Sequence, residues 1–324
     1  PSARPFPSPA RAPTPSARSR RARSRSGRRV WLILLPPGLL LLWLFAVWPP
    51  PVWYRTHWPA QTEFMRLSAQ AGAKGLAPQT YRPVPLDSIA PAMAVAAVTA
   101  EDARFWVHAG IDWYELRHAL GYRRGGFEWG SARDRQAMWY ALGSVPQRKE
   151  ALRGASTITQ QVAKNLYLSP SRNPLRKLKE AVTAYRLEMA LPKRRILELY
   201  LNIAELGPEV WGVEAASRRY YRKSARRLTE SQSAALAATL PFPRTSNPAF
   251  RPVRMRRRQE LILRRMRGER IEVPPVAEEP VPQPGDSIMW TPGMDSLLDS
   301  LRAPVETLPP VRQSTNRSGI TSVR

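Results

Sequence analysis

The chain has 324 residues, with 51 Lys and Arg against 25 Asp and Glu, and therefore a formal net charge of +26. It contains no cysteine, which excludes thiolate catalysis, disulfide bonds and metal sites with cysteine ligands. Roughly 200 residues of mixed composition lie between two compositionally biased ends, which is enough for one domain with a hydrophobic core.

The N-terminal segment, residues 1–29, holds nine arginines and no acidic residue. Such a composition buries too little apolar surface to offset its ordering entropy, so we expect disorder. A basic tail can bind nucleic acid. Its position directly before an apolar run makes attraction to anionic lipid and the setting of topology the simpler interpretation, and we expect no nucleic-acid partner.

Residues 30–48 form an uncharged run rich in Leu and Trp. A helix needs about 20 apolar residues to span a bilayer, so the run predicts one transmembrane helix, kinked at Pro36 and Pro37. The basic flank places the N-terminus inside the cell and the following residues outside. A cleaved signal peptide is the alternative, although no small-x-small cleavage site precedes Pro49.

The segment 49–270 shows mainly helical patterns. Ile89–Ala100 is an apolar run with a proline near its start, where proline is tolerated. Thr157 and Gln160 have capping-box spacing and predict a helix from about Ser156. Further helices are expected at Leu175–Leu191, Arg194–Ala204, Ser231–Leu240 (after a second capping box, Thr229 with Gln232) and Val253–Met266.

Two segments lack such patterns. Residues 121–153 mix Gly, Arg and aromatics without clear periodicity and predict a mobile connector or flap. The Pro-rich residues 271–324 predict a second disordered tail. No alternating strand pattern of any length and no internal repeat occur in the sequence.

Glu101 follows the apolar run Ile89–Ala100 and precedes Asp102. A solvated Glu has a pKa of about 4.3, too low for an effective base at neutral pH. Desolvation at the end of an apolar helix would raise that pKa, so Glu101 is a candidate general base. The alternative is an ordinary acidic residue at a helix end.

The helix expected from Ser156 predicts a seat for phosphate. Its first turn offers backbone N–H groups and the positive end of the helix dipole. Thr157, Gln161 and Lys164 can lie along one face. More cations follow at Arg172, Arg176 and Lys177. A solvated polar helix face is the plainer interpretation.

Glu180 is the second candidate carboxylate. It follows Arg176 by four residues and Lys177 by three, the spacing of a surface ion pair on a helix. The functional alternative is a buried acid that holds one of these cations towards an anion.

Five segments, in order, resemble the motifs of the peptidoglycan glycosyltransferases of family 51. Glu101–Gly110 resembles E-D-x-x-F-x-x-H-x-G, and Gly154–Asn165 resembles G-[GA]-S-T-[IL]-[TS]-Q-Q-x-x-K-N. The other three segments are Arg176–Glu180, Lys193–Asn202 and Gly212–Tyr221. The segment between the first two motifs is longer than in the family pattern.

The branch is indicated by what surrounds these motifs. No Ser-x-x-Lys or Lys-Thr-Gly motif of a penicillin-binding transpeptidase occurs in the chain. Alanine at position 155 and the segment Asn202–Gly207 are similar to the monofunctional biosynthetic transglycosylases. The chain therefore resembles that branch of the family.

The resemblance implies a mainly α, lysozyme-like glycosyltransferase domain over residues 49–270 with a small membrane-proximal jaw, preceded by the transmembrane helix. It implies polymerisation of lipid II into β-1,4-linked glycan with release of undecaprenyl pyrophosphate and inversion at MurNAc C1. The implied location is the periplasmic face of a bacterial inner membrane. The implied partners are lipid II, the growing lipid-linked glycan, the membrane and other cell-wall synthesis or division proteins.

The resemblance also implies residue roles. Glu101 would be the general base and Glu180 the second essential carboxylate. The donor pyrophosphate site would be lined by Thr157, Gln161, Lys164, Arg172 and Arg176. The other motif residues expected to bind substrate are Asp102, Phe105, His108, Ser156 and Asn165. A divalent cation, Mg or Mn, could assist the pyrophosphate, although the sequence offers no dedicated set of metal ligands.

Two other functions remain open at this point. A lysozyme-like enzyme that cleaves glycan would also use a glutamate in a cleft, but it has little use for the cations from Lys164 to Arg176. A membrane-anchored, non-catalytic scaffold would use the basic and Pro-rich tails to recruit partners, and both glutamates would then be dispensable.

Overall fold

The structure is a computed structural model that describes residues 34–71, 80–122, 128–143, 155–169 and 173–271. The chain divides into two compact units, with the boundary between Ala46 and Val47. In the first unit, residues 34–45 are helical. Within the described residues, no helix combines the length and the apolar character that a membrane crossing requires.

Several sequence-based predictions lie outside the described residues. These are the disordered N-terminal segment 1–29, the first residues of the predicted transmembrane run, 30–33, and all but the first residue of the Pro-rich segment 271–324. They stay predictions.

The second unit is mainly helical, as predicted. In chain order its described α-helices are α2 (Glu63–Ala71), α3 (Pro91–Glu101), α4 (Trp113–Ala119), α5 (Ala132–Gly143), α7 (Ile158–Tyr167), α8 (Pro174–Ala190), α9 (Lys193–Ile203), α10 (Val213–Tyr221), α11 (Glu230–Thr239) and α12 (Val253–Met266). Single 3-10 turns lie at η1 (Pro51–Arg55), η2 (Leu86–Ser88), η3 (Phe105–Val107) and η4 (Ala225–Arg227).

The local signals that start these helices act as the sequence predicts. Thr157 caps α7 and Thr229 caps α11, each in a reciprocal capping box with the glutamine three residues later. Pro91 occupies the first turn of α3, where no backbone donor is lost. At α8, the side chain of Asn173 accepts a hydrogen bond from the Arg176 amide.

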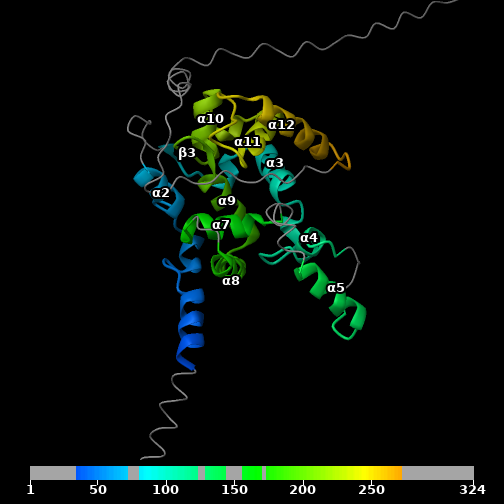
Figure 1. Ribbon diagram of the computed structural model, residues 1–324. Coiled ribbons are helices and arrows are strands. Elements are labelled where there is room, and N and C mark those ends of the chain that lie inside the picture. Colours follow the sequence, from blue (N-terminus) through cyan, green and yellow to red (C-terminus); the bar gives the residue numbers. More distant parts are fainter. Residues whose placement is uncertain (1–33, 72–79, 123–127, 144–154, 170–172, 272–324) are drawn as a thin grey trace, which may run out of the picture. The chain divides into compact units, whose positions relative to one another are not determined.

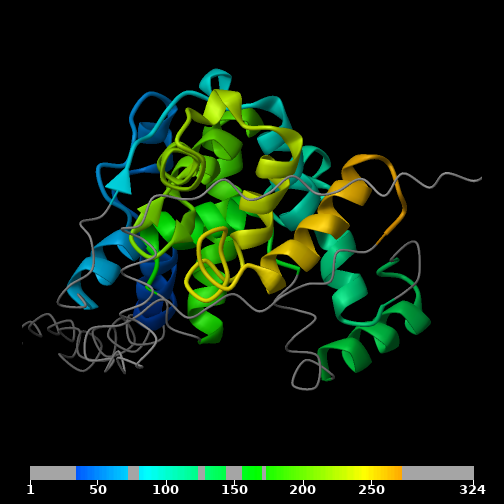
Figure 2. The same cartoon turned by 90° about the horizontal axis from the view of Figure 1, so that it is seen from above.

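Six helices of this unit form two groups around the main hydrophobic cluster (Figures 1 and 2). In one group, α11 packs against α3 and α12; in the other, α7 packs against α8 and α9. Met93 of α3 and Ile158 of α7 are both fully buried in the same cluster. Helix α3 and the N-terminal part of α7 therefore pack in a common core.

Several features differ from the sequence-based expectation, which did not single out helices α2, α4 and α10. Residues 132–143 of the expected flap form α5, whereas 123–127 and 144–153 lie outside the described residues. A small sheet also exists, β1 (Thr80–Tyr81), β3 (Val210–Trp211) and β2 (Glu205–Gly207), in that spatial order, parallel between β1 and β3 and antiparallel between β3 and β2. Strands of two or three residues are too short to show an alternating pattern, and α5 lacks a clear apolar stripe.

Candidate active site

Glu101 is the last residue of α3, and its side chain is 11% exposed. The Nε2 of Gln161, on α7, donates to Glu101 Oε2 at 3.1 Å. The hydroxyl of Tyr200, on α9, donates to Gln161 Oε1 at 2.9 Å and so orients the amide. The carboxylate expected to act as the base is thus held by a chain of side chains from two other helices.

The second oxygen of Glu101 faces an arginine from the far end of the chain. Arg258 Nη2, on α12, lies 3.2 Å from Glu101 Oε1 and donates to the Ala100 carbonyl at 3.0 Å. Arg258 is buried, with 8% of its side chain exposed. A carboxylate at a helix C-terminus faces the negative end of the helix dipole, and the guanidinium offsets both charges.

Asp102 joins the first motif to the start of α7. Its Oδ2 accepts from the Ile158 amide at 2.9 Å, and both of its oxygens contact His108 Nε2, at 2.9 and 3.0 Å. Thr157 Oγ1 donates to the Gly110 carbonyl at 2.7 Å. Asp102 and Thr157 are buried and engaged with protein groups, so they fix the position of α7 relative to Glu101.

This packing changes the expected phosphate seat. The Ile158 amide donates to Asp102, and the Gln160 amide donates to Thr157 Oγ1 at 3.1 Å. These two first-turn N–H groups are therefore engaged within the protein rather than free for a phosphate.

Phe105 and His108, the other predicted residues of the first motif, are also buried. The Phe105 ring is fully buried and lies 4.4 Å from Lys193 Nζ, while its edge meets the His108 ring. Lys193 in turn donates to Glu188 Oε1 at 2.7 Å, which also accepts from Thr159. Phe105 and His108 support the loop between α3 and α4.

Glu180 is the buried acid of the two alternatives, with 2% of its side chain exposed. Arg176 Nη1 donates to Glu180 Oε2 at 2.7 Å, and Lys177 Nζ contacts Glu180 Oε1 and donates to Ser156 Oγ at 2.9 Å. The Lys177 side chain is 45% exposed. A buried carboxylate therefore holds two cations beside the N-terminus of α7.

Of the remaining predicted residues, two lie on α7 and one lies outside the described part of the chain. Lys164 Nζ lies 5.6 Å from the centre of the Phe64 ring, and Asn165 is buried in α7. Arg172 lies outside the described residues.

Lys179 precedes Glu180 on α8. Its partial burial and, to a smaller extent, the positive charge of Arg186 lower the pKa of Lys179.

One group of side chains has the spacing of metal ligands. Asp102, His108 and Asp112 each offer a ligand atom, and these atoms lie within 4.8 Å of one another. Asp112 already accepts from Arg104 Nε at 2.9 Å and caps α4. Asp102 accepts from the first amide of α7, and Asp112 accepts from the first turn of α4. These hydrogen bonds within the protein explain why the three side chains lie close together.

Comparison with known proteins identifies the family. A family model described as Transglycosylase matches residues 125–267, beginning after the Glu101 motif. The biosynthetic peptidoglycan transglycosylase of Bordetella pertussis is 41% identical over 238 residues, covering 73% of this chain and 89% of that protein. Proteins of the same name from an Azoarcus species and Herminiimonas arsenicoxydans are 39% and 38% identical, over 66% and 73% of this chain and 84% and 94% of theirs.

The chain belongs to the biosynthetic peptidoglycan transglycosylase family. This membership makes it a glycosyltransferase of peptidoglycan synthesis, with a lipid II or glycan substrate, and the mainly helical fold fits a lysozyme-like transglycosylase domain.

The sequence analysis did not single out Arg258 or Tyr200 as site residues. A signal for Arg258 was present, because Met255, Arg258 and Ile262 share one helix face and all three are buried. An arginine on the apolar face of a helix is expected to be buried, and a buried arginine is usually paired with an acceptor or a carboxylate. Tyr200 lies in the fourth motif, among the buried residues of α9, and its hydroxyl needs an acceptor.

Proposed function

We propose that Glu101 is the general base of a lipid II polymerase. It removes a proton from the 4-hydroxyl of the acceptor GlcNAc, whose oxygen then attacks C1 of the donor MurNAc. The C1–O bond to undecaprenyl pyrophosphate breaks, and the configuration inverts from α to β. The observation that carries this proposal is the double anchorage of the Glu101 carboxylate by Gln161 and Arg258.

The leaving group needs charge neutralisation more than a proton. Pyrophosphate departs readily when cations neutralise its developing charge. Arg176 and Lys177, both held by the buried Glu180, support this assignment, together with Lys164 on α7. Glu180 orients these cations, and Arg172 is expected to join them. A divalent cation, Mg or Mn, would add positive charge to the pyrophosphate.

We also infer that the protein works at the bacterial inner membrane with its catalytic domain on the periplasmic face. The uncharged run 30–48 and the basic segment before it support a single membrane anchor. Both substrates are attached to lipid, so tethering raises their effective concentration at the enzyme. Other cell-wall synthesis or division proteins are the partners expected at that site.

The base assignment is tested with Glu101→Gln. The amide keeps the shape of the side chain but cannot take a proton, so we expect polymerisation of lipid II to fall by about 100-fold or more while substrate binding stays measurable. Glu260→Gln, an exposed acid on α12, is the control and should polymerise normally. A Glu101→Gln protein with near-normal polymer yield would refute the assignment.

The same assay separates the alternatives. Supplying lipid II together with preformed glycan distinguishes a polymerase, which makes new polymer from lipid II, from a lysozyme-like enzyme, which shortens the preformed glycan. A scaffold would leave both substrates unchanged. The cations on α7 and α8 favour the polymerase, because glycan cleavage releases no pyrophosphate whose charge they could neutralise.

A further inference from the structure

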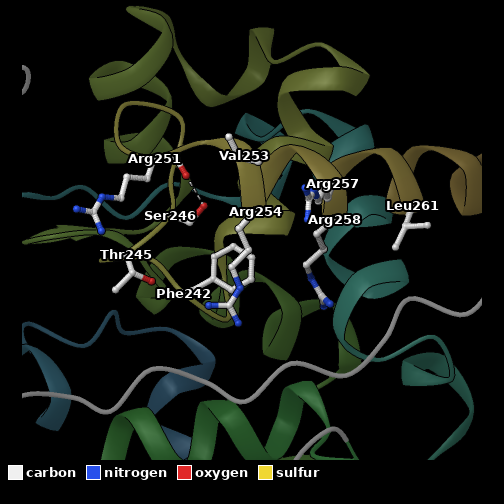
Figure 3. A pocket seen from close by; sticks show the side chains of 9 residues that line it. All are labelled: Phe242, Thr245, Ser246, Arg251, Val253, Arg254, Arg257, Arg258 and Leu261. Carbon is white, nitrogen blue, oxygen red and sulfur yellow. Dashed lines mark hydrogen bonds between the residues drawn. The ribbon is translucent and has the colours of Figure 1, made fainter.

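A hollow of about 710 Å³ lies along α12 and the segment that precedes it (Figure 3). Among the described residues that line it, four are arginines, Arg251, Arg254, Arg257 and Arg258, and none is acidic. We call this hollow the arginine groove. Its positive charge fits an anionic ligand.

Most of this charge is not neutralised by the protein. In the described part of the chain, no ion pair joins Arg251, Arg254 or Arg257 to a carboxylate, and all three side chains are exposed. The Arg254 guanidinium lies 4.4 Å from the centre of the Phe242 ring, and that of Arg251 lies 5.0 Å from the Phe250 ring. Stacking on a ring leaves the N–H edge of a guanidinium available for an oxyanion.

The backbone holds Arg251 in place at one end of the groove. Arg251 has φ +43°, in the left-handed region that non-glycine residues rarely adopt. Ser246 Oγ donates to the Arg251 carbonyl at 2.9 Å and accepts from the Met255 amide at 3.0 Å, and Figure 3 shows the first of these bonds. Ser246 thus ties this strained residue to the first turn of α12.

The other arginines connect the groove to the proposed base. Arg254 and Arg258 both extend from α12 towards the same side in Figure 3, and Arg258 contacts Glu101. The described cations assigned to the pyrophosphate, Lys164, Arg176 and Lys177, lie by contrast on α7 and α8 and are not among the described residues that line the groove. The described residues therefore form two separate groups of cations, and Arg258 connects one of them directly to Glu101.

A lipid-linked peptidoglycan precursor carries two kinds of anion, its pyrophosphate and the free carboxylates of the peptide on its saccharide. The α7–α8 cations account for the first kind. We propose that the arginine groove binds the peptide carboxylates and so positions the saccharide beside Glu101. This inference rests on the proposed function, because it assumes that a peptide-bearing saccharide reaches Glu101.

The test measures binding without turnover. A soluble disaccharide–pentapeptide that lacks lipid and pyrophosphate is titrated into the full-length protein at low ionic strength by calorimetry. We expect Arg254→Gln/Arg257→Gln to raise the Kd about fivefold, because two exposed guanidinium–carboxylate contacts are lost. The control double variant, Arg256→Gln/Arg265→Gln, removes the same charge from α12 outside the groove and should bind as the wild type.

Two further ligands identify the anion. The first is a disaccharide–pentapeptide with amidated carboxylates. The wild type should bind it as weakly as Arg254→Gln/Arg257→Gln binds the unmodified ligand. The double substitution should cause no further loss of affinity for the amidated ligand. Inorganic pyrophosphate should bind the variant and the wild type equally. Three results would each overturn the inference. They are pyrophosphate binding that depends on Arg254 and Arg257, a peptide-free disaccharide that binds the wild type as tightly as the disaccharide–pentapeptide does, and no binding of the disaccharide–pentapeptide.

The binding assay and the polymerisation assay can fail separately, so they distinguish failure of the groove from failure of the proposed function. A wild-type protein that binds the acidic peptide through Arg254 and Arg257 but does not polymerise lipid II would refute the proposed function and keep the groove. A protein that polymerises lipid II with no contribution from these arginines to peptide binding would refute the groove alone.

Discussion

Glu101 is held by two neighbours that act on different oxygen atoms, and each neighbour is itself fixed. Gln161 reaches one oxygen, and the Tyr200 hydroxyl binds the other end of the Gln161 amide. An ionised carboxylate only accepts, so it selects the N–H end of the amide, and the Tyr200 hydroxyl anchors the amide in that orientation. Tyr200 therefore supports the base through Gln161.

Tyr200→Phe tests this support. The substitution removes one buried hydrogen bond, so we expect a loss of about 1 kcal/mol in unfolding free energy. The less firmly held base should lower kcat about tenfold with little change in KM, as measured by lipid II polymerisation kinetics. Tyr185→Phe, an exposed tyrosine on α8, is the control. A normal kcat in Tyr200→Phe would show that Gln161 needs no such support.

The residue roles could be predicted from the sequence only in part. Glu101 at a helix end and the Thr157 capping box depend on neighbours in the chain, and both are found as predicted. The partner of Glu101 on its other side, Arg258, lies 157 positions away, and the choice among the many arginines of α12 is made by tertiary packing. The same packing places Glu180 on the buried stripe of α8 with Thr183, Ala184 and Leu187.

At the scale of elements, the fourth and fifth motifs meet where α9 ends and α10 begins. Gly212 precedes α10 with φ +85°, and a Cβ built on it would lie 2.3 Å from the Asn202 carbonyl oxygen. Asn202 itself is fully buried and bonds both backbone groups of Val84. These motif residues hold α9, which carries Tyr200, in position.

Gly212→Ala should therefore destabilise the whole domain. The positive φ and the clash with backbone together are expected to lower the unfolding free energy by about 3 kcal/mol or more. Thermal denaturation followed by circular dichroism measures the effect. Gly143→Ala is the control, because a Cβ at Gly143 meets nothing within 4 Å. Equal midpoints for the two variants would contradict the close approach of the α9 and α10 segments.

At the same scale, the three short strands were not predicted, and the reason is physical. The strands β1, β2 and β3 have two or three residues and are held by pairings between distant segments, such as Thr80 with Val210. Six helices, α3, α7, α8, α9, α11 and α12, were predicted to within a few residues, whereas α2, α4, α5 and α10 were not. Local signals therefore predicted the longer helices of the core, while non-local pairing decided the sheet.

At the scale of the whole molecule, the proposed membrane anchor and the candidate site fall largely in different compact units. All described residues of the candidate site belong to the unit that begins at Val47, whereas the basic segment 1–29 and residues 30–46 of the uncharged run belong to the unit before it. A membrane anchor contributes effective concentration, which matters only when the substrate is confined to a bilayer. The anchor and the chemistry should thus be separable.

Deletion of residues 1–46 cuts the chain at the boundary between the units and tests this separation. With lipid II in detergent micelles, we expect the polymerisation rate to stay within about twofold of the full chain, because the site is intact. With lipid II in anionic vesicles, we expect the rate to fall at least about tenfold, because the enzyme must find the surface by diffusion. An equal loss in both systems would assign residues 1–46 a part in the fold, and no loss in vesicles would refute the anchor.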